Sequence, residues 1–506
     1  MTFAAHSNTT FARIEFYTFA HGRVTAWKTD NLFMKGMRGP VLSFNTHKRI
    51  GDPVGTWEVA LSGYVVGGEH DGDPWLDIID DGDWVVIDVY RNGKQQGVMI
   101  GRVADVSLAI APGGTGAGEV TITVNGNDVA DPLQATPVYW NPYDSMNDNA
   151  LGFDVASKAD IFKGRADEII PAVIRATMGR GGLFGSHLQT PEGFVASETK
   201  PPFWMDMLDL SSAVVDGLRG ETIPNLITSE SQPSLWGWIS DWRNPVMNEM
   251  WVDTTSQVGA TRKAYLHLRE RPFVNAKDGS QSPWFSLPTR EVKATTLSSV
   301  AVSKGLNRVN HIMLVGELMP EFGKDAYGIY RPIIDKESIR KYGLNRLEES
   351  TQFFDDVGGD TGFGSEYLEW LDLIISWNCL NHDYYQGQIT IAEMRPDIRV
   401  GQKVAIVSGP PALYSAFPAD GGVRSRQMTF YVEGVSHVYQ EGENPITQTQ
   451  LMVSRGYVEG DRVKDLVLAK GNFSALATTP GGSNTPDAVL DIDSDAENAE
   501  GQVVLT

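Results

Sequence analysis

The chain has 506 residues, of which 41% are hydrophobic, and this is enough to fill the cores of two or more domains. Its 52 Gly, 26 Pro and 10% aromatic residues favour strands and turns over a mainly helical fold. The 64 acids and 42 bases give a net charge of −22, which keeps the surface soluble and repels nucleic acid.

Cys379 is the single cysteine, so a disulfide-stapled secreted scaffold is excluded. No apolar run reaches the roughly 18 residues of a membrane span. The N-terminal sequence lacks the basic-then-apolar layout of a signal peptide. We therefore expect a protein that is made and folded in a reducing cytoplasm.

Charge is uneven along the chain. Residues 1–50 are mainly basic, and the stretch "PDAVLDIDSDAENAEGQ" (486–502) carries six acids and no base. Each is either a solvated surface or a docking surface for a partner. The last 30 or so residues also contain few large apolar groups, which predicts a flexible tail.

The first third of the chain is typical of an antiparallel sheet. Asn92-Gly93 separates two apolar runs and is a strong hairpin signal, because both turn positions need positive φ. We predict a small antiparallel barrel over 56–126. The expected strands are 12–20, 40–46, 56–63, 84–90, 97–108 and 119–126.

Helical periodicity interrupts the strands in two blocks, and strands resume at 249–273, 307–318 and 387–453. The expected helices are 155–178, 204–218, 233–242, 335–350 and 364–381. The last of these is apolar almost all round and is expected to be buried.

One phrase of the sequence occurs twice. Gly82, Val85 and Ile87 match Gly401, Val404 and Ile406 at a constant spacing. In the partner strands, the set Ile100, Val103 and Val106 matches the set Val432, Val435 and Val438, and in the third strands Val124 matches Val453. Two unrelated meanders could share such short patterns, but the common order of three strands favours two copies of one unit.

Enzyme signatures are sparse. Cys379 and His382 could form a nucleophile pair, but Cys379 lies in an apolar segment where cysteine is usually inert. The acids of 71–83 lack the glycine and terminal Glu of an EF-hand. Trp236, Trp238 and Trp242 could form a sugar platform or pack in a core. We predict no enzyme activity and assign no catalytic, cofactor-binding or metal-binding residue.

The residues that carry a family resemblance are "IIDDGDWVVIDVY…GVMIGRVADVSL…GEVTITVNGND", "YLHLRERPF" (265–273), "ESIRKYGLNRLEES" (337–350) and "PDIRVGQKVAI…FYVEGVSHVY…TQTQLMVSRG". In this order they resemble phage tail baseplate hub proteins, over about residues 56–456. The resemblance implies a homotrimer whose subunits each carry two tail-tube-like barrels. Three subunits would then present six barrels to a hexameric tail tube. It also implies contact with the tail tube protein, the central spike protein and other baseplate proteins, and transient passage of DNA through an axial channel during genome ejection.

We accordingly predict a mainly β fold with α insertions (α+β), built from two tandem antiparallel β-barrels. The expected divisions are 1–130 as the first barrel, 131–289 as a mixed insertion domain, 290–470 as the second barrel with a helical insertion at about 320–386, and 471–506 as a flexible acidic tail. The expected location is the virion tail, assembled in the host cytoplasm, with no membrane partner and no cofactor. Two alternatives are a carbohydrate-active phage or secreted β-protein and the hub of a secretion-system spike.

Overall fold

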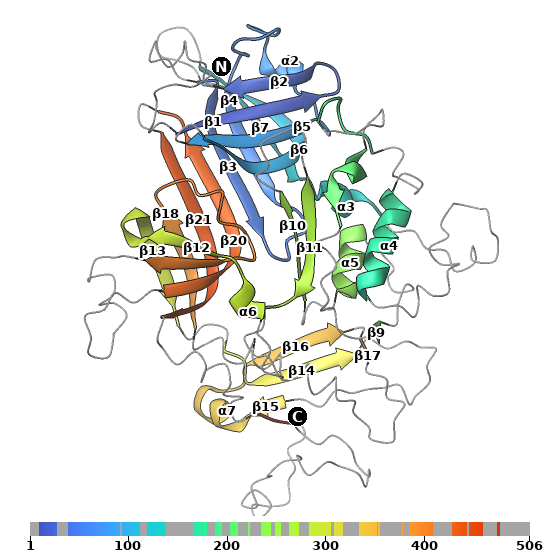
Figure 1. Cartoon of the computed structure of the whole chain (residues 1–506), viewed down its shortest axis with the longest axis vertical. Coiled ribbons are helices and arrows are strands. Elements are labelled where there is room, and N and C mark those ends of the chain that lie inside the picture. Colours follow the sequence, from blue (N-terminus) through green and yellow to red (C-terminus); the bar gives the residue numbers. More distant parts are fainter. Residues whose placement is uncertain are drawn as a thin grey trace, which may run out of the picture.

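A computed structural model shows a mainly antiparallel β protein with few helices (Figure 1). It describes residues 10–27, 39–91, 94–111, 119–137, 166–179, 188–194, 203–210, 221–222, 234–243, 248–254, 263–272, 283–304, 308–316, 333–351, 353–354, 377, 384–407, 428–442, 445–458 and 473–475. In that part of the chain, no helix is long and apolar enough to cross a bilayer.

One 13-stranded sheet dominates the molecule, and eleven of its strands follow the order β13-β18-β21-β20-β3-β4-β7-β6-β5-β1-β2. The other two strands branch from this path, since β19 pairs with β20 and β12 pairs with β19. Its N-terminal half contains β1 (Thr10–Thr18), β2 (Gly22–Trp27), β3 (Val41–Arg49), β4 (Thr56–Ser62), β5 (Trp84–Arg91), β6 (Lys94–Ala111) and β7 (Glu119–Asp128). Its C-terminal half contains β12 (Thr289–Lys293), β13 (Leu297–Ser303), β18 (Tyr385–Ile391), β19 (Lys403–Val407), β20 (Met428–Gln440) and β21 (Ile446–Val458). Figure 1 shows the two halves side by side, the first in blue and the second in yellow-green (β12 and β13) and orange to red (β18, β20 and β21).

Strand registers confirm the repeated unit. The amide of Gly82 donates to the carbonyl of Val103, and the amide of Gly401 donates to the carbonyl of Val432, both at 2.9 Å. In each case the reciprocal amide bonds back to the residue after the glycine. The sequence matched Ile100 with Val432, and this alignment of the second strands is wrong by three residues, because the hydrogen bonds make Val103 the equivalent of Val432. The match of Val124 with Val453 in the third strands is wrong by two residues, because Val124 is opposite Val106 and the equivalent residue opposite Val435 is Leu451.

The repeat extends to five strands in the same chain order: β3, β4, β5, β6 and β7 correspond to β13, β18, β19, β20 and β21. Two ladder irregularities recur with it. One lies between Val41 and Ser43 in β3 and between Leu297 and Ser299 in β13. The other lies between Val103 and Asp105 in β6 and between Val432 and Gly434 in β20. A bulge bends its strand and changes the direction of its side chains, so bulges at equivalent positions indicate that the two repeats share one fold.

Each repeat has its own apolar core. The first includes Phe16, Trp57 and Trp75, and the second includes Ile389, Phe430 and Leu451. The ladders among the described strands form an open path, and no closed barrel is found. The predicted pair of separate barrels therefore differs from the observed sheet, in which pairing of β3 with β20 joins the two repeats.

The two repeats differ at their outer strands. In the first, β5 pairs antiparallel with β1, which pairs in turn with β2. In the second, β19 pairs parallel with β12. The short turn between β3 and β4 (50–55) also corresponds to the long insertion between β13 and β18.

The insertions form smaller units. A three-stranded sheet contains β8 (Leu208–Asp209), β10 (Asn248–Thr254) and β11 (Ala264–Glu270). A four-stranded sheet contains β14 (His311–Gly316), β15 (Ile333–Asp335), β16 (Arg346–Thr351) and β22 (Phe473–Ala475), and β9 (Glu221–Thr222) pairs with β17 (Phe353–Phe354). The helices are α2 (Trp75–Ile78), α3 (Asp131–Ala135), α4 (Ala166–Met178), α5 (Leu235–Trp242), α6 (Pro283–Ser286) and α7 (Lys336–Tyr342), with 3₁₀ turns η3 (Trp204–Asp206) and η5 (Ala294–Thr296).

Several predicted helices are corrected. The segment 204–209 forms η3 and β8, and the predicted helix 335–350 divides into α7 and β16. Gly343 separates these two with φ +79, a backbone region that ends helices readily. The segment 473–475, within the expected flexible tail, forms β22 and pairs with β15. The rest of that tail and nearly all of the expected helix 364–381 lie outside the described residues.

Equivalent glycines give a matched test of the repeat. Gly82 and Gly401 have φ +88 and +78, so an alanine at either position is strained by about 1–2 kcal/mol. A Cβ at Gly82 would meet only the end of the Arg102 side chain at 3.2 Å, whereas one at Gly401 would lie 2.6 Å from the ring of Trp251. We expect Gly401→Ala to lower the unfolding temperature clearly more than Gly82→Ala, as measured by calorimetry. Equal effects would contradict this packing.

Candidate functional site, the seam between the repeats

The candidate functional site is the ladder that joins the repeats, between residues 43–49 of β3 and 434–440 of β20; we call it the seam. Phe44 is opposite Tyr439, and their rings stack with centroids 5.4 Å apart and an angle of 14°. Both are almost fully buried. Such an aromatic pair contributes about 0.5–1.5 kcal/mol beyond its burial. Burial and the hydrogen bond that its hydroxyl donates to Glu441 raise the pKa of Tyr439.

Polar side chains complete the seam. The side chain of His47 lies 2.8 Å from the hydroxyl of Ser436 across the ladder. Thr46 is opposite His437, and both are buried. Burial lowers the pKa of His437 to about 4, so its ring is neutral at pH 7. Its Nδ1 lies 3.2 Å from the hydroxyl of Thr449 on β21.

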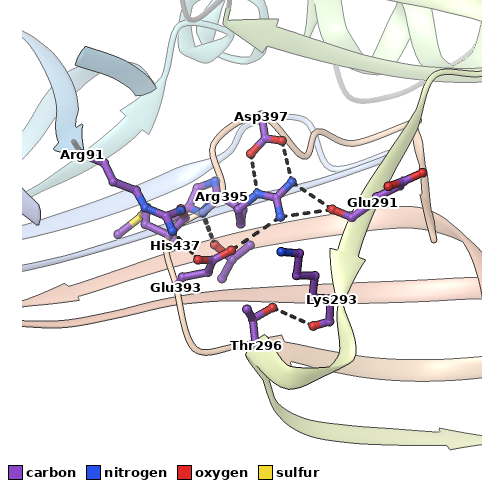
Figure 2. A network of polar contacts seen from close by, with 10 residues as sticks. Arg91, Glu291, Lys293, Thr296, Glu393, Arg395, Asp397 and His437 are labelled. Carbon is purple, nitrogen blue, oxygen red and sulfur yellow. Dashed lines mark hydrogen bonds and ion pairs between the residues drawn. The ribbon is translucent and has the colours of Figure 1, made fainter. Parts of the chain in front are cut away.

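A network of ion pairs lies beside the seam, centred on Arg395 in the loop between β18 and β19 (Figure 2). Its Nε and Nη2 each donate to Asp397 at 2.8 Å, and two of its nitrogens donate to the carbonyl of Glu291 at 3.2 Å. The hydrogen bond to Asp397 raises the pKa of Arg395. Burial acts to raise the pKa of Asp397, but the hydrogen bonds and charge of Arg395 hold it below its usual value.

The same loop reaches into the first repeat. Arg91, at the end of β5, pairs with Glu393 and donates to the carbonyl of Met394 at 3.2 Å (Figure 2). Met394 is 1% exposed and packs in the apolar core of the first repeat. A loop of the second repeat therefore closes part of the core of the first, and the two repeats depend on each other for stability.

The hairpin of β10 and β11 forms a second set of contacts between the repeats. Arg269 donates to Glu249 at 2.7 Å, to the carbonyl of Gly401 at 2.8 Å and to the hydroxyl of Tyr431 at 3.0 Å. The hydroxyl of Tyr431 donates in turn to Glu249 at 2.5 Å. Burial and the charge of Glu249 raise the pKa of Tyr431. The hairpin also bonds to the first repeat, through the amide of Gly51 and the carbonyl of Met250 at 3.0 Å.

A small pocket opens between the seam and this hairpin, and its lining comes from both repeats. The charged groups in its wall pair with one another: Lys48 with Asp128, and Arg399 with Asp253 at 3.0 Å. Among the described residues, no cluster of His, Cys, Asp and Glu could hold a metal ion. The described contacts fix the two repeats against each other.

The sequence candidates fall elsewhere. Trp236 and Trp238 are 4% and 5% exposed and pack in a core with α4, so neither forms an open sugar platform. Asp83, from the acidic stretch 71–83, accepts the amides of Phe19 and Asp80. Cys379 and His382 lie outside the described residues. The sequence did not single out Arg395 or Glu249. Arg269 was only part of the quoted "YLHLRERPF".

No protein-family model and no curated protein matches this chain. Similar solved structures include a tail protein from Neisseria meningitidis MC58, at 11% identity over 88% of this chain and 96% of that one, with a TM-score of 0.42. The 43 kDa tail protein of prophage MuSo2 from Shewanella oneidensis has 10% identity, coverage of 91% and 98%, and a TM-score of 0.44. The E. coli c3393 protein, a component of the type VI secretion system, has 9% identity, coverage of 83% and 74%, and a TM-score of 0.38. TM-scores below 0.5 do not establish a common fold.

The buried pair at the hairpin predicts a stability loss. Glu249→Ala leaves Arg269 and the hydroxyl of Tyr431 without their buried acceptor, and we expect it to destabilise the fold by about 3–5 kcal/mol. Glu291→Ala is the matched control, because that side chain is exposed and only its carbonyl bonds to Arg395. Calorimetry would measure the unfolding temperature of both variants. Equal unfolding temperatures would contradict a stabilising role of the Glu249 contacts.

His437 predicts a pH dependence. Its pKa is lower in the folded chain than the usual 6.5, so the unfolded chain binds more protons between pH 6.5 and about 4. The free energy of unfolding should therefore fall as the pH is lowered through this window, by up to about 3 kcal/mol from this group. In His437→Asn this part of the fall should be lost, as chemical denaturation at several pH values would measure. Identical pH profiles would contradict it.

Proposed function

We propose that this chain is a structural subunit of a phage tail baseplate, a trimeric hub that joins a hexameric tail tube to a central spike. The observation that carries the proposal is the five-strand repeat, with its two units joined edge to edge in one sheet. Two equivalent units per chain provide the factor of two that a threefold adaptor needs to meet six tube subunits. The family resemblance supplies the threefold part.

The contacts at the seam support this role. Sheet pairing, the Arg395 network and the β10–β11 hairpin hold the two units in one orientation. A ring that must match a tube on one side requires such a fixed spacing. In this proposal each repeat acts as one tube-like unit. Residues 131–289 and the insertion between β13 and β18 are domains attached to these units. The axis of the ring forms a passage for DNA. The partners are the tail tube protein, the central spike protein and other baseplate proteins.

A mass measurement and an image test the proposal. We expect light scattering at micromolar concentration to give three times the 55.5 kDa of one chain. Electron microscopy of assembled tails should place the chain on the tail axis with threefold symmetry. A chain that is absent from the tail axis, or present there in a number other than three, would overturn the proposed hub.

A further inference from the structure

The two strands that form the seam, β20 and β3, have equivalents in the other repeat, β6 and β13. No described strand of this chain pairs with the corresponding edges of these equivalents. Strand β20 uses residues 428–431 to pair with β19 and residues 434–440 to pair with β3. The equivalent strand β6 uses residues 94–102 to pair with β5. Beyond the bulge, residues 106–111 of β6 pair only with β7 among the described strands. Likewise β13, the equivalent of β3, pairs only with β18.

Exposure of the side chains follows the same equivalence. Leu108 and Ile110 are 48% and 63% exposed, although they occupy the positions that His437 and Tyr439 fill at 6% and 1%. On β13 the alternation of burial matches that of β3, but Val300 and Val302 are only half-buried where Phe44 and Thr46 are buried. An unpaired strand edge with exposed apolar residues favours pairing with another strand.

We propose that β13 of one copy of this chain pairs antiparallel with residues 106–111 of β6 in a second copy, which repeats the seam between chains. The registers of the seam fix the pairs: Val106 is opposite Lys304, Leu108 opposite Val302, and Ile110 opposite Val300. Leu108, Ile110, Val300 and Val302 then face an interior equivalent to the one that holds Phe44 and Tyr439. Main-chain hydrogen bonds supply the affinity, and the alternating apolar side chains set the register.

This interface is heterologous, because two different edges meet, so successive copies form a closed ring or an open filament. The inference rests on the proposed function only for the number of copies. The edges and the register come from the repeat itself. An experiment can therefore separate an error in the pairing from an error in the trimer.

Cysteine cross-linking tests the register. Ala109 and Ala301 are both exposed and would be directly opposite, and Cα atoms of opposite residues in a ladder are about 4.5–5.5 Å apart, which suits a disulfide. Ala109→Cys with Ala301→Cys, in a Cys379→Ser background, should give a ladder of cross-linked chains on a denaturing gel after mild oxidation. The matched control is Asn45→Cys with Val438→Cys, the equivalent pair of the seam, which should cross-link within one chain and give no ladder.

The outcomes separate the two claims. A ladder that stops at three chains supports both the pairing and the trimer, and one that continues past three supports the pairing and overturns the trimer. A cross-linked dimer from Ala109→Cys alone, or trimers of the double variant without any cross-link, would overturn the pairing. A chain that stays monomeric and uncross-linked at micromolar concentration would overturn it as well.

A charge variant checks the same edge without cysteines. Leu108→Lys with Ile110→Lys should abolish self-association, because the ammonium groups would be buried in the interface, and should leave the unfolding temperature of the single chain nearly unchanged. Leu344→Lys, at a residue that is 56% exposed in the connection between α7 and β16, is the control and should associate as the parent does. Equal association of both variants would contradict the proposed pairing.

Discussion

Backbone pairing between β3 and β20 is the interaction on which the rest of the structure depends. It converts two repeats with separate cores into one sheet, and it satisfies two strand edges that would otherwise be free to pair elsewhere. The Arg395 network and the Met394 side chain act at the same junction. The free energy of these contacts is shared by both repeats, so damage to one is expected to weaken the other.

The ion pair of Arg269 with Glu249 lies largely in the interior of the protein, with side-chain exposures of 20% and 1%, and a buried ion pair adds little net stability but is costly to break. Glu249, Arg269 and Tyr431 come from two different parts of the chain, and their hydrogen bonds are satisfied only when the hairpin sits against the turn at Gly401. Such groups select one arrangement over other compact ones. This account of their role agrees with the proposed hub, in which the two halves keep a fixed spacing.

Sequence patterns predicted much of the sheet and little of the junction. Alternation and the Asn92-Gly93 signal located β5 and β6, and the twofold phrase located β19, β20 and β21. The alignment of the second strands failed because their apolar residues recur at every third position, at Ile100, Val103 and Val106 and at Val432, Val435 and Val438, so a shift by three leaves the pattern matched. The pairing of β3 with β20 could not be predicted, because both edges read as ordinary half-buried strands. Nothing local marks Arg395 or Glu249, whose partners come from distant segments.

The distance along the chain between β3 and β20 also has a consequence for synthesis. About 380 residues separate them, so a ribosome adding 5–20 residues per second completes β20 roughly 20–80 s after β3. Throughout that interval the first repeat has an unfilled edge. The exposed residues of β3 at that edge include Asn45 and Arg49, and polar or charged side chains on an edge strand discourage capture by the wrong chain. The order in which the edges are filled during translation therefore decides whether a chain completes its own sheet before it can pair with another.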